Sequence, residues 1–131
     1  MQFEEFDMLY YGAQASGRLK EDKNKGAVEM FLGNKVAPDF FAWKIPAGES
    51  VRIGLCSSKE GTPFNLLESF LKSRFPGFEL QSRQAGLIPV GALGDLSKGR
   101  VILIGDAACQ TKPLTGGGIY LGRIAAEMLA E

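Results

Sequence analysis

A chain of 131 residues has the size of one domain and can bury a hydrophobic core. Its 15 basic and 15 acidic residues leave no net charge, which argues against a nucleic-acid-binding surface. Because it has no histidine and only two cysteines, it offers no zinc site, disulfide framework or serine–histidine–aspartate triad. Because the apolar runs are too short to cross a bilayer and the N-terminus is not signal-like, we expect a cytoplasmic protein.

The first half of the chain reads as an antiparallel sheet. Alternating side chains and turn residues predict four strands, within 1–20, 27–32, 38–45 and 51–55. Turn-forming residues follow the second and third of these strands. Because strands joined by short turns run in opposite directions, we expect antiparallel pairing.

A helix is predicted over 63–75, with Thr62 as N-cap and Pro63 at its first position. Its apolar residues recur at helical spacing, so one stripe of the helix should pack on the sheet. Pro76 and Gly77 end the pattern. A further strand is expected over 78–89, followed by a connecting loop over 91–99.

The most informative stretch lies near the C-terminus. The unbroken apolar run 101–104 predicts a strand covered on both faces, as in a parallel sheet under helices. It ends at Gly105-Asp106, which would place the carboxylate at the carboxyl edge of the sheet, where open α/β sheets bind ligands.

Three glycines, Gly116 to Gly118, precede a second helical pattern, with Thr115 as the expected N-cap. Glycines are poor helix formers, so a compensating role is expected. They would let a ligand approach the free amides and the positive dipole end of the helix. The alternative is a surface loop in which Asp106 caps a turn and the glycines serve tight packing.

Gly105-Asp106-Ala107-Ala108, Pro113 and the segment 115–120 together resemble the second flavin-binding motif of the geranylgeranyl reductase family, within the flavoproteins of the p-hydroxybenzoate hydroxylase fold. The resemblance implies that Asp106 hydrogen-bonds the ribityl chain of FAD, that the glycine backbone faces the pyrimidine end of the flavin, and that Pro113 lines it. The FAD-binding residues so implied are Gly105, Asp106, Ala107, Pro113, Thr115, Gly116, Gly117 and Gly118.

The segment 37–46 resembles the substrate-domain signature of the same family, Tyr-x-Trp-x-Phe-Pro. Trp43 and Pro46 match, whereas Phe41 stands for the tyrosine and Ile45 for the phenylalanine, so the phenolic hydroxyl is lost. The resemblance implies that Phe41, Trp43, Ile45 and Pro46 bind substrate. Alternation puts Phe41, Trp43 and Ile45 on one strand face and Phe40, Ala42 and Lys44 on the other. The first of these faces suits an isoprenoid chain, but the same residues are also typical of a sheet core.

The implied fold is α+β. A substrate-binding domain over 1–99 would contain the antiparallel sheet and its helix, and 100–131 would be the C-terminal part of an FAD-binding domain. No G-x-G-x-x-G fingerprint follows a predicted strand, so the motif that would bind the ADP half of FAD is missing. The resemblance therefore implies a fragment of a longer flavoprotein.

The implied activity is FAD-dependent reduction of carbon–carbon double bonds in isoprenoid lipid chains, by hydride transfer from reduced flavin. No catalytic residue, proton donor, electron donor or metal site is assigned. The alternatives are a flavin monooxygenase, an electron-transfer flavoprotein-type dehydrogenase of the same fold, and a non-catalytic module. A lipid substrate also implies transient contact with a membrane surface. Cys109 is open to a redox interpretation and to that of a small buried filler.

Overall fold

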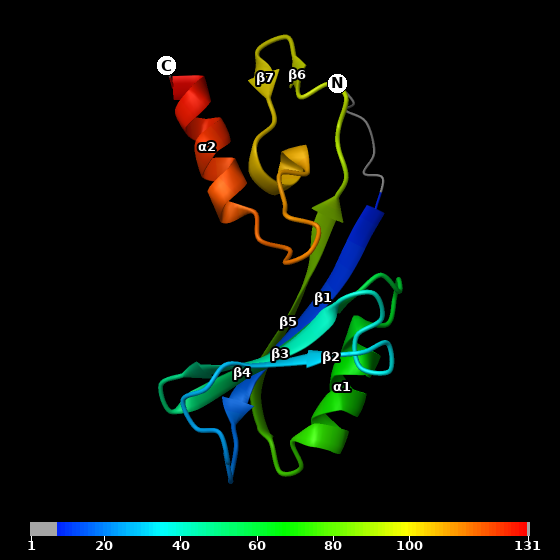
Figure 1. Cartoon of the computed structure of the whole chain (residues 1–131), viewed down its shortest axis with the longest axis vertical. Coiled ribbons are helices and arrows are strands. Elements are labelled where there is room, and N and C mark those ends of the chain that lie inside the picture. The colour runs from blue at the N-terminus through cyan, green and yellow to red at the C-terminus, as the bar shows by residue number, and fades with distance from the viewer. Residues whose placement is uncertain (1–7, 131) are drawn as a thin grey trace. The chain divides into compact units, whose positions relative to one another are not determined.

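The computed structural model describes residues 8–130 and is shown in Figure 1. It contains two compact units. The sheet unit is Tyr10–Leu87, and the C-terminal unit comprises the described residues 8, 9 and 88–130. The boundaries of these units differ from those of the functional domains expected at 1–99 and 100–131. The division into a substrate-binding and an FAD-binding domain stays a prediction. No helix within 8–130 is long and apolar enough to span a membrane.

A five-stranded sheet forms the centre of the sheet unit, with the strand order β2-β3-β4-β1-β5. The pairs β2/β3, β3/β4 and β1/β4 are antiparallel, as the alternation and the short turns predict. Together with the packed helix, this confirms the α+β class. The strands are β1 (Met8–Arg18), β2 (Glu29–Leu32), β3 (Phe41–Ala47), β4 (Ser50–Ser57) and β5 (Glu79–Val90).

The helix α1 (Pro63–Arg74) packs against one face of this sheet (Figure 1). Leu67 and Phe70 of the helix are buried against small and branched side chains of the strands. Thr62 occupies the N-cap position as predicted, but its hydroxyl donates to the carbonyl of Lys59 instead of capping the helix. The buried core consists of Ala13, Ala15, Ala37, Ala42, Val51, Ile53, Leu55, Leu67 and Phe70.

Strand β3 divides its side chains between the two faces of the sheet. Ala42 is buried in the core on the helix side, and Lys44 shares that side by alternation. Phe41, Trp43 and Ile45 therefore lie on the opposite face, and Ile45 is 37% exposed. These three residues thus share one face as predicted, and the alternative that they form the core of the sheet is wrong.

The C-terminal unit corrects the strand predicted over 101–104. Strand β7 covers only Val101–Ile102 and pairs antiparallel with β6 (Ser97–Lys98). Val101, Ile102 and Ile104 are 47%, 50% and 41% exposed, so the run is not covered on both faces. The apolar run predicted burial, but β6 is its one paired neighbour within 8–130, and such a short hairpin cannot cover the faces of β7.

The helix α2 (Ile119–Ala130) begins after the glycine run and not at Thr115. The amide of Gly122 donates to the carbonyl of Gly118, which makes Gly118 the first residue to accept a helical hydrogen bond. Thr115 is not the N-cap, because the amides of Thr115 and Gly116 both donate back to the carbonyl of Lys112 and close a loop there. Its hydroxyl accepts instead from the amide of Gly117, at 3.4 Å.

Candidate functional site

The carboxylate of Asp106 lies against the third glycine of the run. Asp106 stands in η1, a short 3₁₀ helix over Gly105–Ala108, and its side chain is exposed. A Cβ added to Gly118 would lie 2.5 Å from Asp106 Oδ1, closer than real side chains approach. Within 8–130 no hydrogen bond or ion pair engages this carboxylate. The structure thus brings together the two features that the sequence singled out, the acid and the glycine run.

Backbone and side-chain hydrogen bonds fix the loop that carries Asp106. The amide of Gly105 donates to Gln110 Oε1 at 2.7 Å, and the amide of Gln110 donates back to the carbonyl of Gly105 at 3.0 Å. The buried hydroxyl of Thr111 donates to the carbonyl of Pro89. The sequence analysis did not predict these supporting roles of Gln110 and Thr111. The residues that surround a polar side chain in a loop do not reveal which group it will hydrogen-bond.

The remaining residues of the flavin motif lie at the surface of the C-terminal unit. Ala107, Pro113, Thr115 and Gly117 are exposed. Gly105 and Gly116 have φ angles of 64° and 67°, a left-handed backbone that favours glycine. The motif therefore presents an accessible acid, bare backbone and the amino end of α2 on one loop.

Cys109 follows this acid in the left-handed region, with φ at 54°, and is 5% exposed. Glycine would adopt this backbone without strain. The small side chain fills buried space beside Ala108. Its burial favours the interpretation of Cys109 as a filler over the redox interpretation.

On the sheet unit, four aromatic rings form a continuous row on and beside the face away from α1. Ring centroids lie 4.9 Å apart between Tyr10 and Phe40, 4.5 Å between Phe40 and Phe41, and 5.9 Å between Phe41 and Trp43. We call these four residues the aromatic row. Strand β2 adds two exposed apolar side chains, since Met30 pairs with Trp43 and Leu32 with Phe41. Pro46 is half-buried at the far end of β3.

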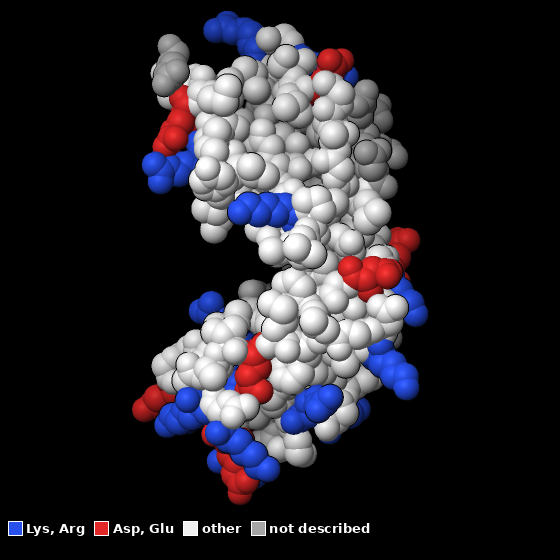
Figure 2. Space-filling model, viewed as in Figure 1, with Lys and Arg blue, Asp and Glu red and all other residues white. Residues whose placement is uncertain are grey.

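Charged side chains of both signs are interspersed on the visible face of the molecule (Figure 2). One group of charges surrounds a buried lysine, however, and the sequence did not reveal it. The side chain of Lys44 is 1% exposed, and its Nζ lies 2.5 Å from Asp22 Oδ1 and 2.6 Å from Glu29 Oε1. We call Asp22, Glu29 and Lys44 the ion cluster. The available sequence signal was the alternation along β3, which puts Lys44 on the same side of the strand as the buried Ala42.

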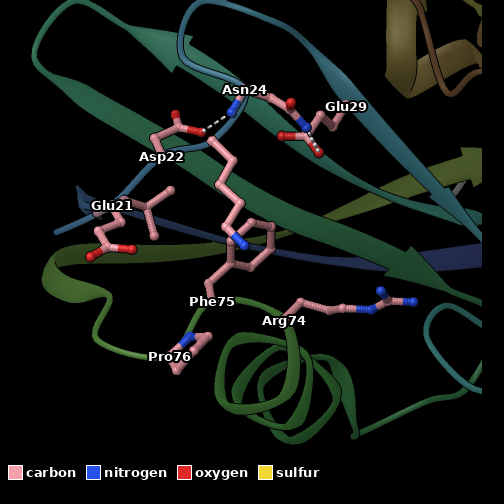
Figure 3. A pocket seen from close by; sticks show the side chains of 9 residues that line it. Glu21, Asp22, Asn24, Glu29, Arg74, Phe75 and Pro76 are labelled. Atoms are coloured by element: carbon pink, nitrogen blue, oxygen red, sulfur yellow. Dashed lines mark hydrogen bonds between the residues drawn. The ribbon is translucent and has the colours of Figure 1, made fainter.

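The two acids of the ion cluster, Asp22 and Glu29, line a pocket of about 390 Å³ (Figure 3). Asn24 hydrogen-bonds both acids of the ion cluster. Its backbone amide donates to Asp22, and its side-chain amide donates to Glu29. Burial lowers the pKa of Lys44, but hydrogen bonds with Asp22 and Glu29 outweigh it and raise the pKa above its usual value. The hydrogen bond from Lys44 lowers the pKa of Glu29. The pocket is lined by Leu19, Glu21, Asp22, Lys23, Asn24, Glu29, Arg74, Phe75 and Pro76.

Solved structures share this fold. A geranylgeranyl bacteriochlorophyll reductase-like protein from Thermoplasma acidophilum superposes with a TM-score of 0.78 at 24% identity, over 95% of this chain and 33% of that one. The flavin-dependent brominase Bmp2 superposes with a TM-score of 0.69 at 16% identity, over 97% of this chain and 36% of that one. At these identities the similarity establishes the fold alone.

Curated relatives are more similar in sequence. A digeranylgeranylglycerophospholipid reductase from Methanothrix thermoacetophila is 38% identical over 113 residues, which cover 79% of this chain and 29% of the relative. A second, from Methanococcoides burtonii, is 33% identical over 84% of this chain and 30% of the relative. No family model matches the chain. The chain thus spans about 30% of the length of these relatives, and over the part that they match its sequence is similar to that of the geranylgeranyl reductase family.

Proposed function

We propose that the whole protein is an FAD-dependent reductase that saturates carbon–carbon double bonds in the isoprenoid chains of lipids. The curated relatives are named as reductases of a lipid that carries geranylgeranyl chains. The structural observation that carries the proposal is the placement of Asp106 Oδ1 against Gly118. An unpaired acid beside bare backbone and a helix start is the donor and acceptor set that a flavin with a polyhydroxylated chain requires.

The C-terminal unit would hold part of the cofactor. Asp106 has free lone pairs with which to accept hydrogen bonds from hydroxyls of the ribityl chain. Amides in the first turn of α2 have no partners within the helix and lie at its positive end, so they would stabilise negative charge on the ring. When bound, FAD would supply the hydride.

The aromatic row would hold the isoprenoid chain. Its rings and the exposed Met30 and Leu32 offer a broad apolar surface with few polar atoms, which suits a hydrocarbon substrate. Phe41 lacks the hydroxyl of the family tyrosine, so that position cannot deliver a proton. Because such a substrate is a membrane lipid, we also propose a cytoplasmic protein in transient contact with a membrane surface.

The cofactor site is tested by a flavin titration of the whole protein and of its Asp106→Ala variant. We expect the variant to bind FAD about tenfold more weakly, because it loses a hydrogen bond to a charged acceptor. Fluorescence quenching of the flavin measures the affinity, and circular dichroism of both proteins checks that the variant folds. Equal affinities would remove Asp106 from the cofactor site.

The reaction itself is tested by mass spectrometry of a geranylgeranyl lipid incubated with the whole protein and chemically reduced flavin. The reductase should add two hydrogens to each double bond that reacts. Incorporation of an oxygen atom would instead identify a monooxygenase of the same fold. A protein that binds FAD and leaves the lipid unchanged would favour a non-catalytic module.

A further inference from the structure

The indole ring of Trp43 is held from two sides by residues that the family signature does not include. We infer that Gly54 and Gln14 are positioning residues that fix this ring as a flat wall for the isoprenoid chain. We call Gly54 and Gln14 the clamp. That the ring binds a lipid rests on the proposed function, whereas the clamp itself rests on the contacts around the ring. Neither Gly54 nor Gln14 has to touch the substrate for this role.

Gly54 provides the space that the ring occupies. Trp43 of β3 and Gly54 of β4 are directly paired across the sheet. A Cβ on Gly54 would lie 2.5 Å from Trp43 Cζ2, 2.6 Å from Trp43 Cε2 and 2.9 Å from the carbonyl oxygen of Ala13. The ring therefore lies directly on the backbone of Gly54, and any side chain at this position would displace it.

Gln14 fixes the other side of the ring. Gln14 of β1 pairs with Gly54, so Gln14, Gly54 and Trp43 lie in line across three neighbouring strands. The indole Nε1 donates to Gln14 Oε1 at 3.1 Å. The ring thus extends from β3 over the glycine to β1, where its one polar atom is satisfied. This leaves the apolar part of the indole available on the surface of the sheet.

Fixing the ring matters because Trp43 ends the aromatic row. Its ring meets that of Phe41 nearly edge to face, with an interplanar angle of 65°. Met30 stands beside it on β2 and is 63% exposed. A ring that could rotate would have to be ordered each time a chain binds, and that cost would weaken binding. The clamp removes the cost by ordering the ring beforehand.

The chain contains a single tryptophan, so fluorescence excited at a wavelength that tyrosine does not absorb reports on this ring alone. In the 131-residue chain without lipid, we expect Gly54→Ala and Gln14→Leu to shift the emission to longer wavelength and to increase quenching by acrylamide. Gln14→Glu keeps the acceptor oxygen and should retain the wild-type signal. Gly86→Ala is the matched glycine control, because a Cβ there meets nothing within 4 Å.

Titration with geranylgeraniol then measures binding through the same signal. We expect Gly54→Ala and Gln14→Leu to bind it roughly three- to tenfold more weakly, and the two control variants to bind it as the wild type does. Thermal unfolding by circular dichroism separates this effect from a loss of stability. If Gly54→Ala does not fold, the comparison of Gln14→Leu with Gln14→Glu decides.

The outcomes distinguish the clamp from the lipid site. Unchanged lipid-free spectra in Gly54→Ala and Gln14→Leu would overturn the clamp, and changed spectra with unchanged lipid affinity would overturn its role in positioning. A wild-type chain that gives no response to geranylgeraniol would overturn the lipid site together with this role. A wild-type response that only the two clamp variants weaken supports the inference.

Discussion

Replacing Lys44 with methionine is expected to lower the free energy of unfolding of the chain by about 3 kcal/mol, because it leaves two carboxylates without their shared cation. Asp22 and Glu29 both lie within 2.6 Å of the Lys44 ammonium, and their side chains are only 14% and 25% exposed. Methionine fills a similar volume but neutralises neither acid. Urea denaturation followed by circular dichroism measures the change.

Lys23→Met is the matched control for this variant. Lys23 also lines the pocket, yet it is exposed, and no ion pair within 8–130 engages it. Its replacement should change stability by less than about 0.5 kcal/mol. A loss of similar size in both variants would mean that the pocket is merely sensitive to charge and that the ion cluster has no special contribution.

The ion cluster also predicts how stability depends on pH. The pKa of Glu29 is lowered from 4.5 in the folded chain. The stability that Glu29 contributes is therefore fully present above pH 4.5 and is lost as the pH falls through its pKa in the folded state. The pKa of Lys44 is raised from 10.5, so its contribution is present below that value and is lost as the pH rises through the higher folded pKa. Denaturation curves at several pH values should show a plateau between these limits for the wild type. Lys44→Met should lose less stability than the wild type at both ends.

Local patterns were sufficient to predict the sheet and α1. Alternation in 38–45 correctly placed Trp43 on one strand face and Lys44 on the other, since strand geometry alone determines this. The pattern could not reveal what covers each face. The acids that neutralise Lys44 lie 22 and 15 residues away along the chain, Asp22 in the loop before β2 and Glu29 at the first residue of β2.

The same limit explains the error at 101–104. A short apolar run indicates that a segment can be buried, but not that partners exist to bury it. In the structure Val101 and Ile102 pair only with Lys98 and Ser97 within the described residues, and both remain exposed. Asp106 and Gly118 were both singled out because they belong to one sequence motif. The supports from Gln110 and Thr111 depend on tertiary contacts that no motif records.

Gly118→Ala is expected to weaken FAD binding by the whole protein roughly 10- to 100-fold, since overpacking of this kind typically costs 1–3 kcal/mol. The new Cβ would lie 2.5 Å from Asp106 Oδ1 and 3.3 Å from Thr111 Cγ2. Either the carboxylate must turn away or the start of α2 must move. Both movements separate the acid from the helix amides, so the change should affect the cofactor site more than loss of the acid alone. Flavin titration measures the affinity.

A double-mutant cycle shows whether the loss comes from the contact with the acid. In the Asp106→Ala background the carboxylate is absent, so adding Cβ to Gly118 should cost much less than it does in the wild type, with a coupling of about 1–2 kcal/mol. A smaller cost remains from the contact with Thr111. If Gly118→Ala instead weakens binding equally in both backgrounds, the glycine acts independently of Asp106. The pairing of acid and glycine proposed as the basis of flavin binding would then be wrong, even if each residue alone contributes to affinity.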